Sequence, residues 1–180
     1  MMSEKEILRA WARRTARAIS GLRRAESDLA AAERLYALEA FKAAKTVFCY
    51  VSVGDEVSTC KIIESAIRLH KTVCVPRCLS GNIMEAVAIS AFNDLECDLF
   101  QIPSIRKDGR IIPASGIDFA VLPCLCADQK GYRIGHGKGY YDRFLADYRG
   151  LSAVLCRKEL LVNQIPVQPY DQKADFVIVT

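Results

Sequence analysis

The chain has 180 residues, of which 51% are hydrophobic and 26% charged, so it can bury a core and lacks the composition of a disordered segment. Its 25 Lys and Arg residues outnumber its 21 Asp and Glu residues, a mild excess that suits a protein that handles anions. The first residues have no apolar secretion core, and no apolar run is long enough to span a bilayer. We therefore expect a cytoplasmic protein that does not bind a membrane.

The N-terminal third has the periodicity of helices. Apolar residues recur at three- and four-residue steps from Leu8 to Leu22 and predict an amphipathic helix. Basic residues at positions 5, 9, 13 and 17 form a stripe beside this apolar face. Ser20-Gly21 interrupts the helix, and Ser27-Asp28 is expected to cap a second helix that runs through Ala40.

From residue 46 onward, short β-branched and aromatic runs alternate with helical segments. We expect strands at 46–52, 71–76, 83–89, 117–122, 152–156 and 176–179, one helix that begins at Ser58 or Thr59, and another at 140–148. Residues 90–115 have little periodicity and are expected to form a long surface excursion. The alternation predicts the α/β class: a single three-layer, Rossmann-like domain over residues 1–180 with a mostly parallel sheet and an N-terminal helical pair.

Eight cysteines are present, and no pair has the spacing of a zinc site or of a dithiol redox motif. Cys49, Cys74 and Cys156 fall within apolar, strand-like runs, where a thiol packs as a small hydrophobic group. Because no secretion signal is seen, we expect reduced packing cysteines rather than disulfides.

The most informative stretch runs from Gly131 to Arg143 and follows the strand expected at 117–122. Glycines at 135, 137 and 139 allow left-handed backbone angles and let successive N–H groups point inward at the start of the next helix. Arg133 and Lys138 add full positive charges, so the segment suits phosphate binding. The spacing differs from the dinucleotide fingerprint and from the P-loop, and a flexible turn before a helix explains the glycines alone equally well.

The run LPCLCADQKGYRIGHGKGYYDRFL, which ends at Leu145, resembles the signature of the 5-formyltetrahydrofolate cyclo-ligase family, Gly-x-Arg-Leu-Gly-x-Gly-x-Gly-Tyr-Tyr-Asp. Weaker matches follow the family's order along nearly the whole chain: Lys5-x-x-x-Arg9, Glu56-x-x-Thr59, Pro76, Met84, and Pro166 with Tyr170-Asp171. The sequence departs from the family at four positions that usually hold Phe, Gly, Pro and Gln: Ala127, Cys124, Ile105 and Leu160.

The resemblance implies an enzyme that converts 5-formyltetrahydrofolate and ATP to 5,10-methenyltetrahydrofolate, ADP and phosphate, by phosphorylating the formyl oxygen. It implies that ATP contacts Lys5, Arg9, Arg133, Ile134, Gly135, His136, Gly137, Lys138, Gly139, Tyr140 and Tyr141. The catalytic residues would be Lys138, His136 and Arg133, and the folate would contact Val51, Glu56, His136, Lys138 and Tyr140. Asp142 and Asp171 would hold Mg²⁺ as the cofactor, because this ion prefers carboxylate and phosphate oxygens.

Two other function classes remain open. A nucleic-acid-binding module would use the arginines of the N-terminal helices, but the net charge is only +4 and no nucleic-acid motif is present. A regulatory protein that binds ATP without turnover would carry the same glycine segment. The presence of both Asp142 and Asp171 favours the enzyme. We expect a monomer whose partners are ATP and 5-formyltetrahydrofolate rather than nucleic acid.

Overall fold

The computed structural model describes residues 2–97, 103–105 and 109–180. Its main helices and strands are α1 (Glu4–Ala18), α2 (Gly21–Ala37), α3 (Glu39–Ala43), β1 (Thr46–Cys49), α4 (Cys60–Arg68), β2 (Thr72–Cys78), β3 (Met84–Ile89), β4 (Leu95–Cys97), β5 (Pro103–Ile105), β6 (Ile111–Ile112), β7 (Phe119–Leu122), β8 (Cys126–Asp128), β9 (Arg133–Ile134), α5 (Tyr140–Asp147), β10 (Leu151–Cys156), β11 (Leu161–Val162) and β12 (Phe176–Val179). Within these residues, no helix has the length and apolarity that crossing a membrane requires.

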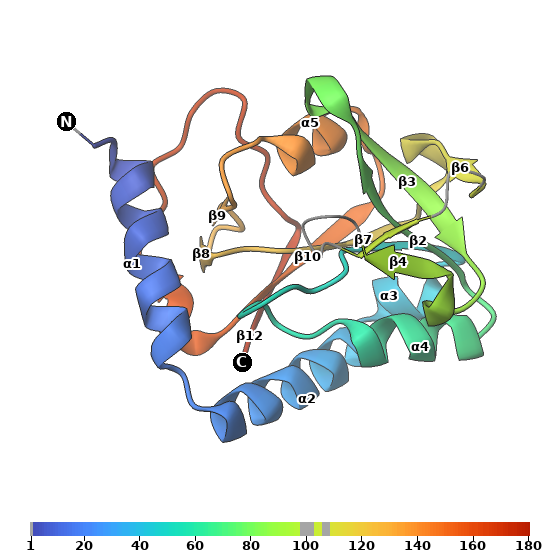
Figure 1. Ribbon diagram of the computed structural model, residues 1–180, viewed down its shortest axis with the longest axis horizontal. Coiled ribbons are helices and arrows are strands. Elements are labelled where there is room, and N and C mark those ends of the chain that lie inside the picture. The colour runs from blue at the N-terminus through green and yellow to red at the C-terminus, as the bar shows by residue number, and fades with distance from the viewer. Residues whose placement is uncertain (1, 98–102, 106–108) are drawn as a thin grey trace.

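The main sheet has seven strands in the order β12-β10-β7-β1-β2-β3-β6 (Figure 1). The five strands from β12 to β2 are mutually parallel, whereas β3 and β6 are antiparallel to their neighbours. The predicted mostly parallel sheet is therefore confirmed. The chain moves from β1 outward through β2 and later from β7 outward through β10, so the strand order switches between β1 and β7. Open α/β sheets bind ligands beyond the carboxyl ends of the strands at such a switch point.

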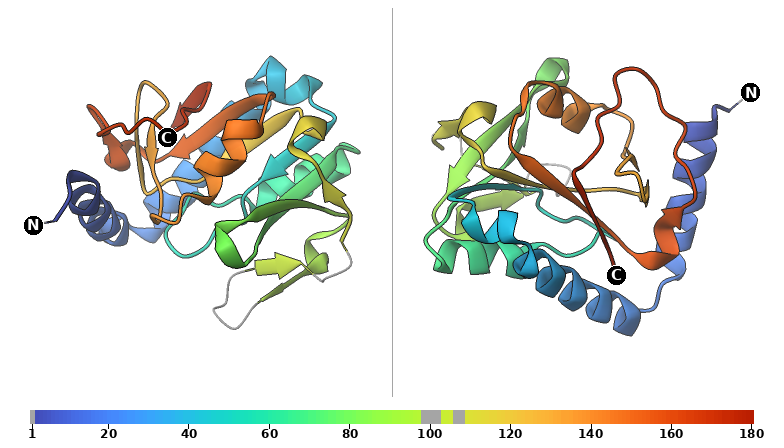
Figure 2. Two further views of the ribbon diagram at one scale, coloured as in Figure 1. Left: turned by 90° about the horizontal axis from the view of Figure 1, so that it is seen from above. Right: turned by 180° about the vertical axis from the view of Figure 1, so that it is seen from behind.

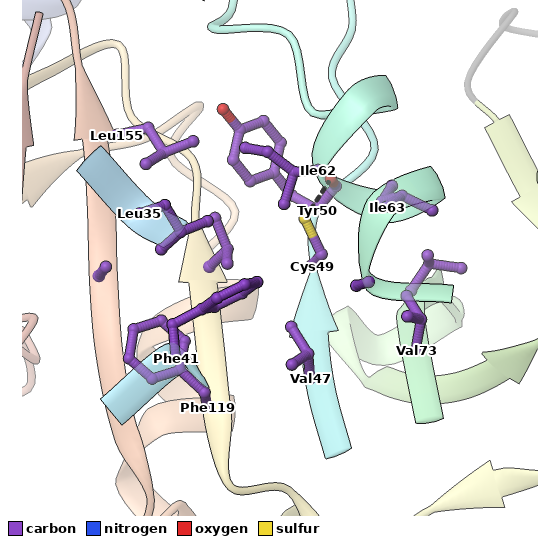
Figure 3. Close-up of a cluster of buried hydrophobic side chains, with 14 of the residues drawn as sticks. Leu35, Phe41, Val47, Cys49, Tyr50, Ile62, Ile63, Val73, Phe119 and Leu155 are labelled. Carbon is purple, nitrogen blue, oxygen red and sulfur yellow. Dashed lines mark hydrogen bonds between the residues drawn. The ribbon is translucent and has the colours of Figure 1, made fainter. Parts of the chain in front are cut away.

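Two buried cores cover the two faces of the sheet, because successive residues of a strand point to opposite faces. Val47 and Cys49 of β1 face a core that is shared with α2, α3 and α4 (Figure 3). Phe48, between them, faces the second core, to which α1, α5, β8 and β9 contribute. Figure 2 shows these elements on either side of the sheet. The three-layer α/β arrangement agrees with the sequence prediction. Because both faces of the sheet are covered, central strands such as β1 and β7 are nearly continuous buried apolar runs.

The predicted start of the second helix was wrong. The helix begins at Gly21, and the side chain of Ser20 caps it by accepting a hydrogen bond from the third residue along. Ser27 lies inside the helix, fully buried, with its hydroxyl 2.6 Å from that of Thr180. Asp28 does not cap a helix either: its carboxylate pairs with Arg157 at 2.9 Å. The helix ends at Ala37, before the predicted Ala40, and α3 follows as a separate element.

The predicted surface excursion over residues 90–115 was also partly wrong. β4 and β5 form an antiparallel hairpin, and β6 joins the edge of the main sheet beside β3. These strands have two or three residues each, too few to show a period-2 pattern. Residues 98–102 and 106–108 of this excursion lie outside the described residues. The six predicted strands and the helices expected near residue 59 and at 140–148 agree with the structure to within three residues at either end, whereas the first helix spans Glu4–Ala18 and lies four residues earlier than the apolar pattern from Leu8 to Leu22.

Candidate functional site

The candidate site lies beyond the carboxyl ends of β1, β7 and β10. The loops that follow these strands bring together Glu56, Cys124, Leu125 and Leu160, which line one pocket of about 240 Å³. α1 closes the pocket on another side, and β8 and β9 lie beside this helix (Figure 1). The site therefore occupies the switch point between β1 and β7 that the topology favours for ligands.

The glycine-rich loop at 135–139 connects β9 to α5. Gly137 and Gly139 have φ values of 98° and 68°, in the left-handed region that favours glycine. Gly139 is also the N-cap of α5, so the loop ends at the positive end of that helix. Gly135 does not have a left-handed φ. The predicted left-handed backbone is therefore found at two of the three alternating glycines.

The N–H groups of the glycine loop make no hydrogen bond within the part of the protein that the structure describes. In the described part of the chain, none of the five N–H groups of residues 135–139 donates a hydrogen bond to another protein group. Two carbonyl groups of the loop are held instead: that of Gly135 accepts from Arg9 Nε at 3.0 Å, and that of Lys138 accepts from Arg143. The carbonyl groups of the loop are thus fixed by two arginines. Its backbone N–H groups remain available to bind an external anion.

The basic residues of α1 that the resemblance singled out lie against this loop. The Arg9 guanidinium packs so closely on Gly137 that a Cβ there would lie 3.4 Å from Arg9 Cζ. Lys5 forms an ion pair with Asp171 and lies 5.7 Å from the ring centre of Tyr170. α1 therefore brings two cations to the glycine loop and to one of the two predicted metal ligands.

The two predicted metal ligands are linked through the backbone at residues 171–172. Asp142 Oδ1 lies 3.4 Å from Arg133 Nη1 and accepts a hydrogen bond from the backbone N–H of Gln172, the residue after Asp171. Arg133 also donates to the carbonyl of Gln172 at 2.9 Å, and its side chain is only 4% exposed. Within the residues that the structure describes, no three ligand-type side chains converge. Two carboxylates fit Mg²⁺, which proteins commonly hold through one or two carboxylates while substrate phosphates and water complete its shell.

Two of the five predicted folate contacts, Glu56 and His136, line the same pocket. His136 Nε2 lies 3.5 Å from Glu56 Oε1. The Glu56 side chain is 11% exposed and that of His136 is 56% exposed, so the carboxylate lies deeper than the imidazole. The other carboxylate oxygen of Glu56 accepts from Val53 N at 2.9 Å, which fixes its orientation. Val51 is buried at the start of the same loop.

The remaining residues of the glycine segment differ in exposure. The Lys138 side chain is exposed and has no hydrogen bond or ion pair among the described residues. Tyr140 donates to the carbonyl of Leu79 at 3.4 Å. Tyr141 packs toward the core, and burial, together with the negative charge of Glu56, raises the pKa of its phenol. The Ile134 side chain is buried in the core, so only its backbone can serve a ligand.

Two buried charged residues shape the site although the sequence assigned no role to either. Asp128, fully buried, accepts hydrogen bonds from three backbone N–H groups, those of Lys130, Tyr132 and Ile165. Its position three residues before a glycine is a turn signal that could have indicated this role. Arg157 is 2% exposed and donates to the carbonyl of Glu56 at 3.0 Å, which holds the Glu56 loop in place. An arginine after an apolar strand carries no such signal.

The departures from the family pattern fall in different places. Leu160 is buried at the pocket wall, and Ala127 is buried within β8. The backbone of Ile105 pairs with Leu95 in the β4–β5 hairpin, away from the pocket.

The arginines that a nucleic-acid module would use are partly occupied by acidic partners: Arg23 contacts Glu159 at 2.7 Å. This arrangement does not favour one continuous basic surface.

A mostly parallel α/β sheet with a glycine-rich loop and a pocket at its switch point defines an open, doubly wound α/β protein. The chain belongs to the 5-formyltetrahydrofolate cyclo-ligase family, whose model matches residues 1–180. It is 29% identical to the mouse 5-formyltetrahydrofolate cyclo-ligase over 98% of this chain and 93% of the relative. The corresponding Escherichia coli protein is 27% identical over 88% of this chain and 91% of the relative.

Two solved structures have the same fold. A 5,10-methenyltetrahydrofolate synthetase from Aquifex aeolicus superposes with a TM-score of 0.87 at 24% identity, over 98% of this chain and 90% of the other. The synthetase from Mycoplasma pneumoniae gives a TM-score of 0.79 at 19% identity over 98% of both chains. At these identities the likeness establishes the architecture, and the family match confirms the resemblance noted in the sequence.

Proposed function

We propose that this protein catalyses the ATP- and Mg²⁺-dependent conversion of 5-formyltetrahydrofolate to 5,10-methenyltetrahydrofolate, with release of ADP and phosphate. Family membership indicates the reaction. The observation that carries the proposal is the glycine loop, whose N–H groups have no acceptor in the described part of the protein and which lies against Arg9 of α1. Every proposed site residue comes from one chain, so the site does not require a second subunit. We propose that the protein is a monomer and that it acts in the cytoplasm.

The triphosphate of ATP binds at the glycine loop in this proposal. The N–H groups of residues 135–139 donate to phosphate oxygens, the start of α5 adds its positive end, and Arg9 and Lys138 supply full charges. Lys5 extends the cationic surface, Tyr141 and the backbone of Ile134 form the wall behind it, and Arg133 holds Asp142 in position. Asp142 and Asp171 would hold Mg²⁺, which neutralises phosphate charge when it is bound.

The folate binds across the pocket from the glycine loop. Glu56 is suited to accept hydrogen bonds from the N–H groups of a pterin ring, because its carboxylate is fixed by Val53 and lies at the pocket floor. Val51 contributes an apolar contact, and His136 and Tyr140 lie between the folate and the nucleotide. This arrangement would bring the formyl group of the folate close to the terminal phosphate of ATP.

The chemistry requires activation of an amide-like oxygen. The formyl oxygen attacks the γ-phosphorus, the bond to the β–γ bridging oxygen breaks, and ADP leaves. N10 then attacks the formyl carbon, the bond from this carbon to the phosphorylated oxygen breaks, phosphate leaves, and the N10 proton passes to solvent. Lys138 and His136 neutralise the charge on the transferring phosphoryl group. The protein contributes position and electrostatic stabilisation rather than a covalent nucleophile.

A spectroscopic assay tests the proposal. Purified protein is mixed with 5-formyltetrahydrofolate, ATP and Mg²⁺, the absorbance of the methenyl product is followed, and ADP and phosphate are quantified. We expect one ADP and one phosphate per methenyl group formed, and no product when any component is omitted. Binding of ATP without product would favour a regulatory protein and contradict the proposed reaction.

A further inference from the structure

The basic stripe of α1 continues beyond the glycine loop. Lys5 and Arg9 contact Asp171 and Gly135, as described above. Arg13 and Arg17 follow at further four-residue steps, so they lie on the same side of the helix. At a rise of 1.5 Å per residue, the stripe from Lys5 to Arg17 is about 18 Å long. One helix therefore presents cations along a path that leads away from the proposed phosphate site.

Arg13 and Arg17 line the pocket at the carboxyl ends of the parallel strands. Both residues are exposed, and neither makes a hydrogen bond or an ion pair with any residue that the structure describes. The next arginines along the chain differ, because Arg23 contacts Glu159 at 2.7 Å and Arg24 contacts Asp55 at 2.6 Å. The pocket thus contains two guanidinium groups without a protein counter-charge.

The other walls of the pocket do not neutralise these charges. The two carboxylates at the pocket, those of Asp55 and Glu56, already have partners, Arg24 and His136. Apolar groups make up another part of the wall: Ala16, Leu125 and Leu160. The pocket therefore combines an apolar surface with two uncompensated cations, a pair of features that suits an anion carried on an apolar body.

We propose that this pocket binds the p-aminobenzoyl-glutamate end of the folate, with Arg13 and Arg17 as the partners of its carboxylates. This inference rests on the proposed function and assigns a part of the same substrate to residues that the family resemblance did not supply. The benzoyl ring packs on Leu125 and Leu160, and the guanidinium groups match the planar, bidentate geometry of carboxylates. Glu56 and His136 lie at the same pocket, so the proposed glutamate contacts adjoin the proposed pterin contacts.

The stripe on α1 then contacts both substrates. Its first two cations face the nucleotide site, and its last two face the acidic end of the folate. Arg13 and Arg17 act as specificity-determining residues, because a pteridine without a glutamate has nothing to neutralise them.

The experiment compares two ligands and four variants. The variants are Arg13→Gln, Arg17→Gln, the double variant, and Arg14→Gln as a control on the same helix that does not line the pocket. Calorimetry measures the Kd of 5-formyltetrahydrofolate and of the matching pteroate amide, 5-formyltetrahydropteroyl amide, which keeps the benzoyl ring but has no carboxylate. We expect the double variant to weaken folate binding by at least about tenfold, the usual effect of losing a charged hydrogen bond. Its Kd for the pteroate amide, its KM for ATP and all constants of Arg14→Gln should remain as in the unsubstituted protein.

Several results would overturn this inference. An unchanged folate Kd in the double variant, or an equal loss for both ligands, would show that the arginines do not recognise the glutamate. A rise in the KM for ATP alone would assign them to phosphate binding. The proposed function fails separately: arginine-dependent folate binding without turnover would support the pocket and contradict the reaction, whereas turnover with an unchanged folate Kd would contradict the pocket alone. Failure of the unsubstituted protein to bind either ligand would overturn both.

Discussion

Substitution of Gly131 by alanine is the sharpest test of how the site is held together. Gly131 follows β8 with a φ of 92°, and a Cβ on it would lie 2.2 Å from the carbonyl oxygen of Ala174. The two residues are also joined by a hydrogen bond from Ala174 N to Gly131 O at 2.9 Å. Ala174 lies three residues after Asp171, so the substitution pushes directly on the segment that carries a proposed metal ligand.

The expected loss of stability has two parts. A left-handed backbone costs a residue with a Cβ about 1–2 kcal/mol. Since real Cβ contacts essentially never fall below 3.0 Å, the backbone at Ala174 must also move by at least 0.8 Å. Overpacking of this kind costs about 1–3 kcal/mol, and the strained hydrogen bond adds about 1 kcal/mol. Gly131→Ala should therefore lower the free energy of unfolding by about 3–6 kcal/mol, which lowers the Tm of a chain of this size by roughly 6–24 °C.

Gly54→Ala is the matched control. Gly54 also has a positive φ, 58°, but a Cβ there would meet no atom within 4 Å. Only the backbone strain remains, so the free energy of unfolding should fall by about 1 kcal/mol. Thermal unfolding followed by circular dichroism compares the two variants at one pH. Equal decreases in Tm would refute the argument, because the two positions differ mainly in the space available to the new methyl group.

Three further predictions concern charge and ionisation. Lys138→Ala should lower kcat at least about a hundredfold with an unchanged Tm, because the exposed side chain packs on nothing; wild-type kinetics would contradict its role. Asp142→Asn should raise the Mg²⁺ concentration for half-maximal rate without changing the folate KM, and an unchanged metal titration would exclude it as a ligand. Burial raises the pKa of Cys74 and Cys126 from 9.0 to about 12, so a thiol reagent at pH 8 should label exposed Cys78 first. Because unfolded thiols ionise at lower pH than these buried ones, stability should fall between pH 9 and 12, and a flat Tm there would contradict the shifts.

The sequence alone determined the features that depend on near neighbours. Apolar runs predicted most of the strands, and the last one, Phe176–Val179, agrees residue for residue. The alternating glycines before Tyr140 predicted both the loop and the helix that follows it. These signals are local, because backbone angles and side-chain alternation are set within a few residues. The family signature lies in this same local segment, which is why it could be recognised from the sequence.

Only the tertiary structure decided which charges have partners. Lys5 and Asp171 are 166 residues apart in the chain and form an ion pair, so their proximity depends on how α1 packs against the last loop. Arg157 holds the Glu56 loop from inside the protein, whereas Arg13 and Arg17 remain unpaired at the pocket among the residues described. All these arginines are the same residue type, and the sequence cannot separate them. Burial and the positions of distant acidic groups distinguish them, and both arise only when the layers assemble.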